Sequence, residues 1–165
     1  MDNTNESETM KIRPAEIHEK SIILHLMSEA FKHIEKQIAG FSFGKRTEQF
    51  NEIAEEKIER LFKDKKSKLF VVEYLNVLVG YIIARIEIDK SYSKEVKGIL
   101  TEVWVSKDHK DQDTTQKLIK TAETWLIENG AETIQATWNH NDVKEGKIWQ
   151  GISYTPMAMT SIKML

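Results

Sequence analysis

The sequence contains no cysteine. This absence excludes disulfide bonds, cysteine nucleophiles and zinc sites built on thiolates. The net charge is also small, −2 at neutral pH, which argues against nucleic acid as the main partner. No apolar run is long enough to span a membrane, and the N-terminal MDNTNESET is acidic and polar, unlike a signal peptide. We therefore expect a cytoplasmic protein with neither a membrane nor a nucleic-acid partner.

Several catalytic signatures are missing as well. The five histidines lack the spacing of metal ligands, so we expect no metal site. Neither a Gly-x-Ser-x-Gly elbow nor a Gly-x-x-x-x-Gly-Lys phosphate loop occurs. The 165 residues suit one domain, and no repeat, low-complexity segment or linker interrupts them. We expect a disordered tail over residues 1–9 and a single domain over residues 10–165.

Apolar periodicity predicts the element order β-α-α-β-β-β-α-β-α-β, which is typical of a one-domain α/β fold with a mixed sheet. Pro14 is expected in the first turn of the first helix. The expected strands include 68–75 and 77–88, joined by a tight turn near Asn76. The last segment, 153–165, is expected to form a terminal strand or hairpin arm.

The stretch from Gly98 to Gly130 is the most informative part of the chain. It begins as a β-branched strand, passes through a polar loop at 106–113, and continues as a helix over 114–129. The apolar positions predicted to face the core are Leu118, Ala122, Trp125 and Leu126. A strand that enters a helix through such a loop leaves main-chain amides pointing outward. The helix start therefore favours an anion.

The same stretch resembles the GNAT superfamily of N-acetyltransferases. Glu102, Val103, Trp104 and Val105 match the family's Glu-apolar-aromatic-Val strand, and residues 79–81, Val-Gly-Tyr, resemble an earlier strand of that fold. The resemblance implies a single-domain GNAT-like fold with a mixed, mostly antiparallel sheet flanked by helices. It also implies acetyl-CoA as the cofactor and an amine as the acceptor.

The resemblance assigns roles to particular residues. Main-chain groups of 103–105 would hold the thioester, and Glu102 would be the base. The alternative for Glu102 is an exposed strand residue in a cross-strand pair. Asn141 matches a family asparagine. Trp149 stands where the family has its acidic tyrosine, and we expect it to be a packing residue because an indole N–H is not a useful acid. Tyr154 is the nearby hydroxyl, and we take it as the candidate acid.

The cofactor loop departs from the family pattern, in which glycines let main-chain amides approach a pyrophosphate. Lys110 keeps the positive charge, but Asp113 and Thr115 stand where the glycines are expected. We expect Asp113 to cap a helix that begins at Thr114 and so to occupy amides that a phosphate would use. At about 5 Å and an effective dielectric of about 20, its repulsion of one phosphate charge is roughly 3 kcal/mol.

Two functions therefore remain open. The first is an N-acetyltransferase that uses acetyl-CoA and an unknown acceptor, either a small-molecule amine or a peptide amine. The second is a catalytically inactive GNAT-fold binding or regulatory module, with acetyl-CoA binding weak or absent. The sequence leaves the oligomeric state open, a homodimer included.

Overall fold

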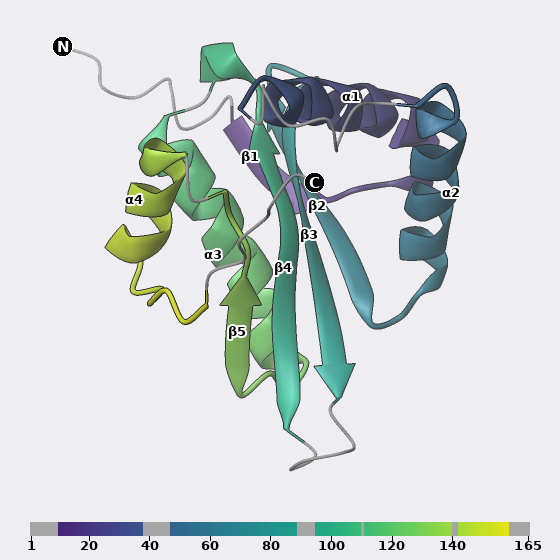
Figure 1. Cartoon of the computed structure of the whole chain (residues 1–165). Helices are drawn as coiled ribbons and strands as arrows, with labels where there is room; N and C mark the ends of the chain where they lie inside the picture. The colour runs from purple at the N-terminus through teal and green to yellow at the C-terminus, as the bar shows by residue number, and fades with distance from the viewer. Residues whose placement is uncertain (1–9, 38–46, 89–94, 110, 140–141, 159–165) are drawn as a thin grey trace, which may run out of the picture.

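A computed structural model describes residues 10–37, 47–88, 95–109, 111–139 and 142–158 (Figure 1). The tail over residues 1–9 and the predicted site residues Lys110 and Asn141 lie outside the described residues. The elements are β1 (Met10–Pro14), a 3-10 helix (Ile17–Glu19), α1 (Lys20–Gln37), α2 (Phe50–Lys63), β2 (Ser67–Tyr74), β3 (Val77–Ile88), β4 (Val96–Val105), a second 3-10 helix (Lys107–His109), α3 (Gln112–Glu128), β5 (Thr133–Ala136) and α4 (Val143–Gly151). No helix among these residues combines the length and the apolar composition that crossing a membrane requires.

One five-stranded sheet in the order β1-β2-β3-β4-β5 organises the fold. The first four strands pair antiparallel, while β4 and β5 pair parallel. This sheet confirms the predicted α/β class, and the three consecutive antiparallel strands over 68–105 confirm the predicted pairing. The turn between β2 and β3 is tight because Leu75 and Asn76 both adopt positive φ, at 49° and 65°.

Helices cover both faces of the sheet. Residues along each strand point alternately to opposite sides, so the strands contribute apolar side chains to a core on each face. Figure 1 shows α1 and α2 grouped apart from α3 and α4. On the α3 face, the core is formed by Phe70, Val72, Ile82, Leu100, Val105, Leu118, Ile119, Ala122, Leu126 and Trp149, among others. On the α1–α2 face it is formed by Ile23, Leu26, Met27, Ile58, Val71, Tyr81 and Ile83, among others. Each helix therefore buries one apolar stripe, as its periodicity predicts.

The sheet changes at Thr101, in the middle of β4. The register with β3 shifts there, because Ile83 faces Glu102 while the next residue, Ala84, faces Leu100. Thr101 is thus the extra residue of a β-bulge, which bends a strand and increases its twist. The pairing with β5 ends at the same place, at Leu100 and Ala136. Beyond the bulge, β4 continues without β5 beside it.

Gly80 holds β3 close to this end of β4. A Cβ built on Gly80 would lie 2.7 Å from the main-chain oxygen of Trp104 and 3.1 Å from a methyl group of Val105. A side chain of any size would force the two strands apart. Gly80 also lies next to an irregularity on its other side, because the β2–β3 register shifts between its partner Val72 and Glu73.

Two local predictions are wrong in the described residues, and a third holds only in part. Pro14 ends β1 opposite Phe70 instead of starting a helix; β1 is an edge strand, where a residue without an N–H is tolerated. Trp125 packs against the core on the α3 face as predicted, edge-on to Phe70 at 6.5 Å, but it is only half-buried. The chain from Tyr154 to Ala158 forms no strand, because it leaves α4 through a turn with Ser153 at positive φ; residues 159–165 lie outside the described residues.

Candidate active site

The direction of the main-chain groups at the end of β4 follows from one hydrogen bond. The N–H of Ser106 donates to the carbonyl oxygen of Val79 at 2.7 Å. In an antiparallel pair, residues that exchange hydrogen bonds alternate with residues that do not. Counting back from Ser106 along this register, Trp104 and Glu102 direct their main-chain groups toward β3.

Val103 and Val105 direct theirs to the opposite side. This is the side on which β5 pairs with β4 only as far as Leu100. The two side chains pack on the α3 face. Past the end of β5, these residues therefore contribute their main-chain N–H and C=O groups to the edge of β4. Two amides of one strand edge thus point toward the gap between β4 and β5. The sequence prediction gave main-chain groups of Val103, Trp104 and Val105 the same role. The register shows that those of Trp104 point toward β3, whereas those of Val103 and Val105 point the other way.

Glu102 lies on the α1–α2 face, with its carboxylate held between two donors. The phenol of Tyr81 donates to Oε2 at 3.1 Å, and the ammonium of Lys57 contacts Oε1. Tyr81 is buried, and its pKa is raised well above the ordinary value by burial first and by the charge and hydrogen bond of Glu102 second. Tyr81 therefore stays protonated and remains a donor to the carboxylate. These contacts are more than the cross-strand pair that was the alternative interpretation of Glu102.

A second group of side chains crosses from α1 to α4 beside Trp104. The ring of His33 on α1 lies 5.2 Å from the indole of Trp104, tilted by 52°. Nε2 of His33 lies 3.8 Å from Oδ2 of Asp142. The other oxygen of this carboxylate, Oδ1, accepts a hydrogen bond from the N–H of Glu145 at 2.9 Å and so caps α4. Glu102 and Trp104 are two residues apart and therefore lie on the same face of β4. The α1–α2 side of this site thus carries two carboxylates, that of Glu102 and that of Asp142.

The first turn of α3 is closed by its own residues. Oδ1 of Asp111 accepts a hydrogen bond from the N–H of Thr114 at 2.6 Å. The carbonyl oxygen of Asp111 accepts from the hydroxyl of Thr115 at 3.0 Å, and the hydroxyl of Thr114 points to the sulfur of Met10 at 3.4 Å. Thr114 and Thr115 are both buried. Part of the amide edge that an anion would use is therefore already occupied.

The predicted cap at Asp113 is wrong. The helix begins at Gln112 instead of Thr114, and Asp111 is its cap. Asp113 is exposed and its carboxylate pairs with Lys117 four residues later, at 2.6 Å. In the sequence Asp-Gln-Asp-Thr either aspartate is a residue type that caps helices, so residue type alone does not decide between them.

Tyr154 lies on the other face of the sheet from Glu102. Its phenol donates to Oε1 of Glu123 on α3 at 2.8 Å, and its ring lies edge-on to Trp149 at 4.9 Å. Burial, followed by the hydrogen bond and charge of Glu123, raises the pKa of Tyr154 well above its ordinary value. Trp149 is 1% exposed and stacks on Trp138 with ring centroids 6.1 Å apart, which confirms it as a packing residue.

Sequence reasoning missed four residues of this site: Lys57, Tyr81, His33 and Asp142. Lys57 belongs to a helix face rich in Lys and Glu, a composition that is typical of a solvated face. His33 was grouped with the scattered histidines. Tyr81 was noticed only as part of Val-Gly-Tyr. A carboxylate followed three residues later by glutamate, at Asp142 and Glu145, is a helix-start signal that the sequence did offer.

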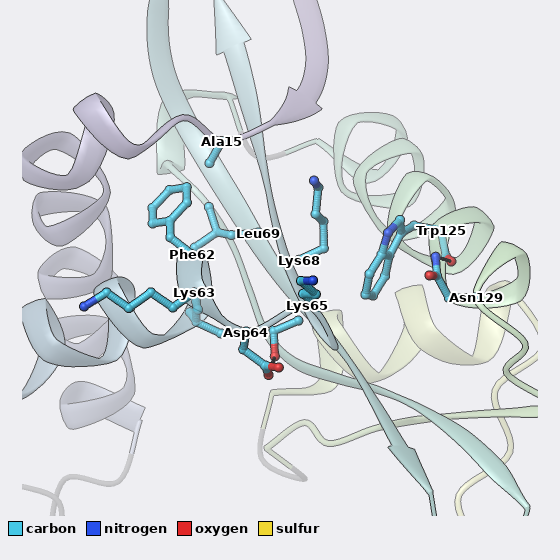
Figure 2. A pocket seen from close by; sticks show the side chains of 11 residues that line it. Ala15, Phe62, Lys63, Asp64, Lys65, Lys68, Leu69, Trp125 and Asn129 are labelled. Carbon is cyan, nitrogen blue, oxygen red and sulfur yellow. Dashed lines mark hydrogen bonds between the residues drawn. The ribbon is translucent and has the colours of Figure 1, made fainter.

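A separate cleft of about 270 Å³ lies between the ends of α2 and α3, where β2 extends beyond β1 (Figure 2). It is lined by Lys63, Lys65, Lys68, Phe62, Trp125 and Asn129, among others. None of the residues described above at the end of β4 or at the start of α3 lines it. The described residues hold no group of three or more side chains of the kinds that ligate metals.

Comparison with known proteins gives the family of this chain and structures with a similar fold. The Acetyltransferase (GNAT) family matches residues 25–144, well over half of the chain. No curated protein is significantly similar to it in sequence. Solved structures are similar in fold. They include an aminoglycoside acetyltransferase, meta-AAC0020, from an uncultured soil metagenomic sample in complex with sisomicin (TM-score 0.70, 16% identity, covering 96% of this chain and 97% of that one).

Two further structures represent different acceptors. The aminoglycoside N-acetyltransferase AAC(6')-Iy in complex with CoA has a TM-score of 0.72 at 13% identity, over 94% of each chain. A ribosomal-protein-alanine N-acetyltransferase from Brucella melitensis biovar Abortus 2308 has a TM-score of 0.71 at 13% identity, over 94% of this chain and 99% of that one. At such identities the similarity establishes the fold alone.

Proposed function

The chain belongs to the GNAT family of acetyltransferases, and we propose that it is an N-acetyltransferase that moves an acetyl group from acetyl-CoA to an amine. The end of β4 carries this proposal. The amides of Val103 and Val105 lie beyond the last pair with β5, and Glu102 precedes them on the same strand. Transfer from a thioester needs donors aimed at the carbonyl oxygen and a base for the attacking amine. Both requirements are met within one short segment.

In this proposal the amides of Val103 and Val105 hold the thioester carbonyl, and Glu102 accepts a proton from the acceptor amine. Tyr81 is a positioning residue, because its hydrogen bond keeps the carboxylate oriented. Lys57 neutralises the carboxylate while no acceptor is bound. The ammonium group of the acceptor would then take the place of the Lys57 ammonium beside Glu102. The half-buried carboxylate would thus keep a positive partner throughout the exchange.

Tyr154 is the proposed acid for the departing sulfur. Its raised pKa keeps the phenolic proton in place at neutral pH. It lies on the α3 face, opposite Glu102, so base and acid would approach the thioester from the two sides of the sheet. Its hydrogen bond to Glu123 has to open before the proton can be donated.

The pyrophosphate of acetyl-CoA would lie against the start of α3, where the candidate contacts are Lys110, Asp113, Thr114, Thr115 and, farther along the chain, Asn141. The fit is incomplete, because Asp111 already accepts from the N–H of Thr114. We therefore propose that acetyl-CoA binds weakly unless the side chain of Asp111 turns away. This same observation favours the second candidate function, a GNAT-fold binding or regulatory module without catalysis.

The acceptor is proposed to be a cationic amine. Glu102 and Asp142 place two carboxylates near Trp104 on the α1–α2 side, which favours a positively charged group. The similar structures include one bound to sisomicin and one named for a ribosomal-protein alanine. Both a small molecule and a peptide terminus therefore belong in the first panel of acceptors.

Calorimetric titration with acetyl-CoA and with CoA separates the two candidate functions. The enzyme proposal requires acetyl-CoA binding together with release of free CoA thiol when the amine panel is added. Binding of neither compound would contradict the enzyme proposal and favour the binding module. Binding without thiol release across sisomicin, spermidine and an alanine-terminated peptide would also favour the module.

A further inference from the structure

Lys57 brings an amine of the chain itself to the proposed base. It lies on α2, and its ammonium contacts Oε1 of Glu102 on β4 across the α1–α2 face. The side chain keeps 40% of its surface exposed, and that of Glu102 keeps 35%, so the pair is open to an incoming group. The carboxylate thus contacts a primary amine of the kind that an N-acetyltransferase modifies.

This position distinguishes Lys57 from other paired lysines in the described part of the chain. Lys20 pairs with Glu55 and Glu59 of α2, at 2.7 and 2.9 Å, on the helix surface. Lys117 pairs with Asp113 within one helix. None of those three carboxylates lies on β4. Of the three lysines, Lys57 alone contacts a carboxylate on the strand that carries the amides of Val103 and Val105.

We propose that Lys57 is an acetyl acceptor, so that the protein acetylates its own second helix. This inference rests on the proposed function, because the donor and the base are the same. Lys57 gives one ammonium proton to Glu102, which releases it to solvent, and Nζ then forms a bond to the acetyl carbon. As that bond forms, the carbon–sulfur bond breaks. Tyr154, the proposed acid, protonates the sulfur, which leaves as CoA thiol. The second Nζ proton is released and replaces the one that Tyr154 gave, and the third stays on the amide nitrogen.

Acetylation of Lys57 would change the site permanently. An acetylated lysine carries no charge, so the ion pair with Glu102 would be lost and the carboxylate would be left to an external amine. The unmodified protein would hold its base in an ion pair, whereas the modified protein would not. A single self-acetylation event would therefore precede efficient transfer to other acceptors.

The test is peptide mass mapping of the purified full chain after incubation with acetyl-CoA. Lys57 is expected to gain one acetyl group at least about ten-fold faster than Lys20 or Lys117, which serve as matched ion-paired controls. Its rate constant should not change with protein concentration, because donor and acceptor belong to one molecule. In Glu102→Gln protein the rate at Lys57 should fall to that of the control lysines, whose own rates stay unchanged.

Two further variants keep the test decisive. Tyr81→Phe removes one contact of Glu102 without touching the ion pair, so it should slow acetylation of Lys57 if Glu102→Gln does not fold. Lys57→Arg retains the positive charge and pairs with Glu102, but its guanidinium cannot be deprotonated. It should therefore show no gain of acetyl at position 57 while its circular dichroism matches that of the native protein.

Each contrary result has a distinct meaning. If an external amine is acetylated while Lys57 reacts no faster than Lys20, the inference is wrong and the proposed function stands. If Lys57 reacts as fast in Glu102→Gln and in Tyr81→Phe as in the native protein, the modification is ordinary chemical acetylation and the inference is wrong. If acetyl-CoA neither binds nor loses its acetyl group, the proposed function and this inference fail together.

Discussion

Asp111 and Thr114 close the first turn of α3 on itself, with Oδ1 of Asp111 2.6 Å from the main-chain nitrogen of Thr114. The same carboxylate brings a negative charge to the helix start against which we propose that the pyrophosphate of acetyl-CoA lies. In that proposal the acetyl donor would compete with this side chain for one amide and would be repelled by its charge. Removing Asp111 should show how strongly that competition limits binding.

Asp111→Ala should tighten binding of acetyl-CoA and lower the stability of the free protein. Loss of the charge removes a repulsion of roughly 3 kcal/mol at about 5 Å, an upper limit of about two decades in affinity. Loss of the cap should cost about 1 kcal/mol of unfolding free energy. Asp111→Asn keeps the cap and removes only the charge, and Asp113→Asn is the exposed control. Calorimetry and denaturant unfolding measure both effects; equal affinities in all four proteins would contradict the competition.

Glu102→Gln should lower kcat by roughly 10²–10⁴-fold, the usual contribution of a positioned base. Tyr81→Phe should lower it less, because the carboxylate remains and only its orientation is affected. The double variant should be no slower than Glu102→Gln alone, since Tyr81 acts through Glu102. Initial rates of CoA thiol release measure all three proteins. An unaltered rate in Glu102→Gln would remove this residue from the mechanism.

Trp149→Ala should destabilise the fold more than Trp125→Ala. Trp149 is 1% exposed and contacts Trp138 and Tyr154, so its removal leaves a cavity and should cost roughly 3–5 kcal/mol. Trp125 is half-buried at the edge of the core, so its removal should cost less, about 1–2 kcal/mol. Urea unfolding with a common m-value compares them. A larger loss for Trp125→Ala would place the core on a different face of α3.

Gly80→Ala should weaken the pairing of β3 and β4 next to the site. The added methyl group would lie 2.7 Å from the carbonyl oxygen of Trp104, and relieving that overlap should cost roughly 1–3 kcal/mol. Gly151→Ala is the matched control, because its nearest neighbour there, Nε2 of Gln116, is 4.0 Å away. Thermal unfolding of the two variants should separate them. Equal melting temperatures would show that β4 adjusts without cost.

Glu19 should make the protein sensitive to acid. Its pKa is lowered, first by the hydrogen bond from Arg13, which donates at 2.6 and 3.1 Å. A lowered folded-state pKa stabilises the fold above the unfolded-state value of about 4.3. This contribution is lost as pH falls through the lower folded-state value.

Glu19→Gln should therefore destabilise the protein by roughly 2 kcal/mol at neutral pH, and the difference should shrink as the pH falls below about 4. Glu56→Gln, on the exposed face of α2, is the control and should change stability little at any pH. Urea unfolding between neutral and acid pH measures both variants. A constant difference between native protein and Glu19→Gln would show that the ion pair with Arg13 is unimportant.

The periodic elements were predictable because their signals are local. The strands from Ser67 to Val105 and the helix from Gln112 to Glu128 carry alternating or helical apolar patterns, and the structure places them where those patterns indicate. Short-range features were less certain. Asp111 and not Asp113 is the cap of α3, and residue type alone does not decide between these two aspartates.

The sequence by itself determined the α/β sheet, the family resemblance and the choice of Glu102 as the candidate base, because each depends on residue types within a few positions of one another. Only the tertiary structure placed Lys57 against Glu102, 45 residues apart, and His33 near Asp142. Such pairs form when packing of whole helices on the sheet brings distant surfaces together. The pattern of residues within one helix or strand does not indicate which residue of another element it will contact.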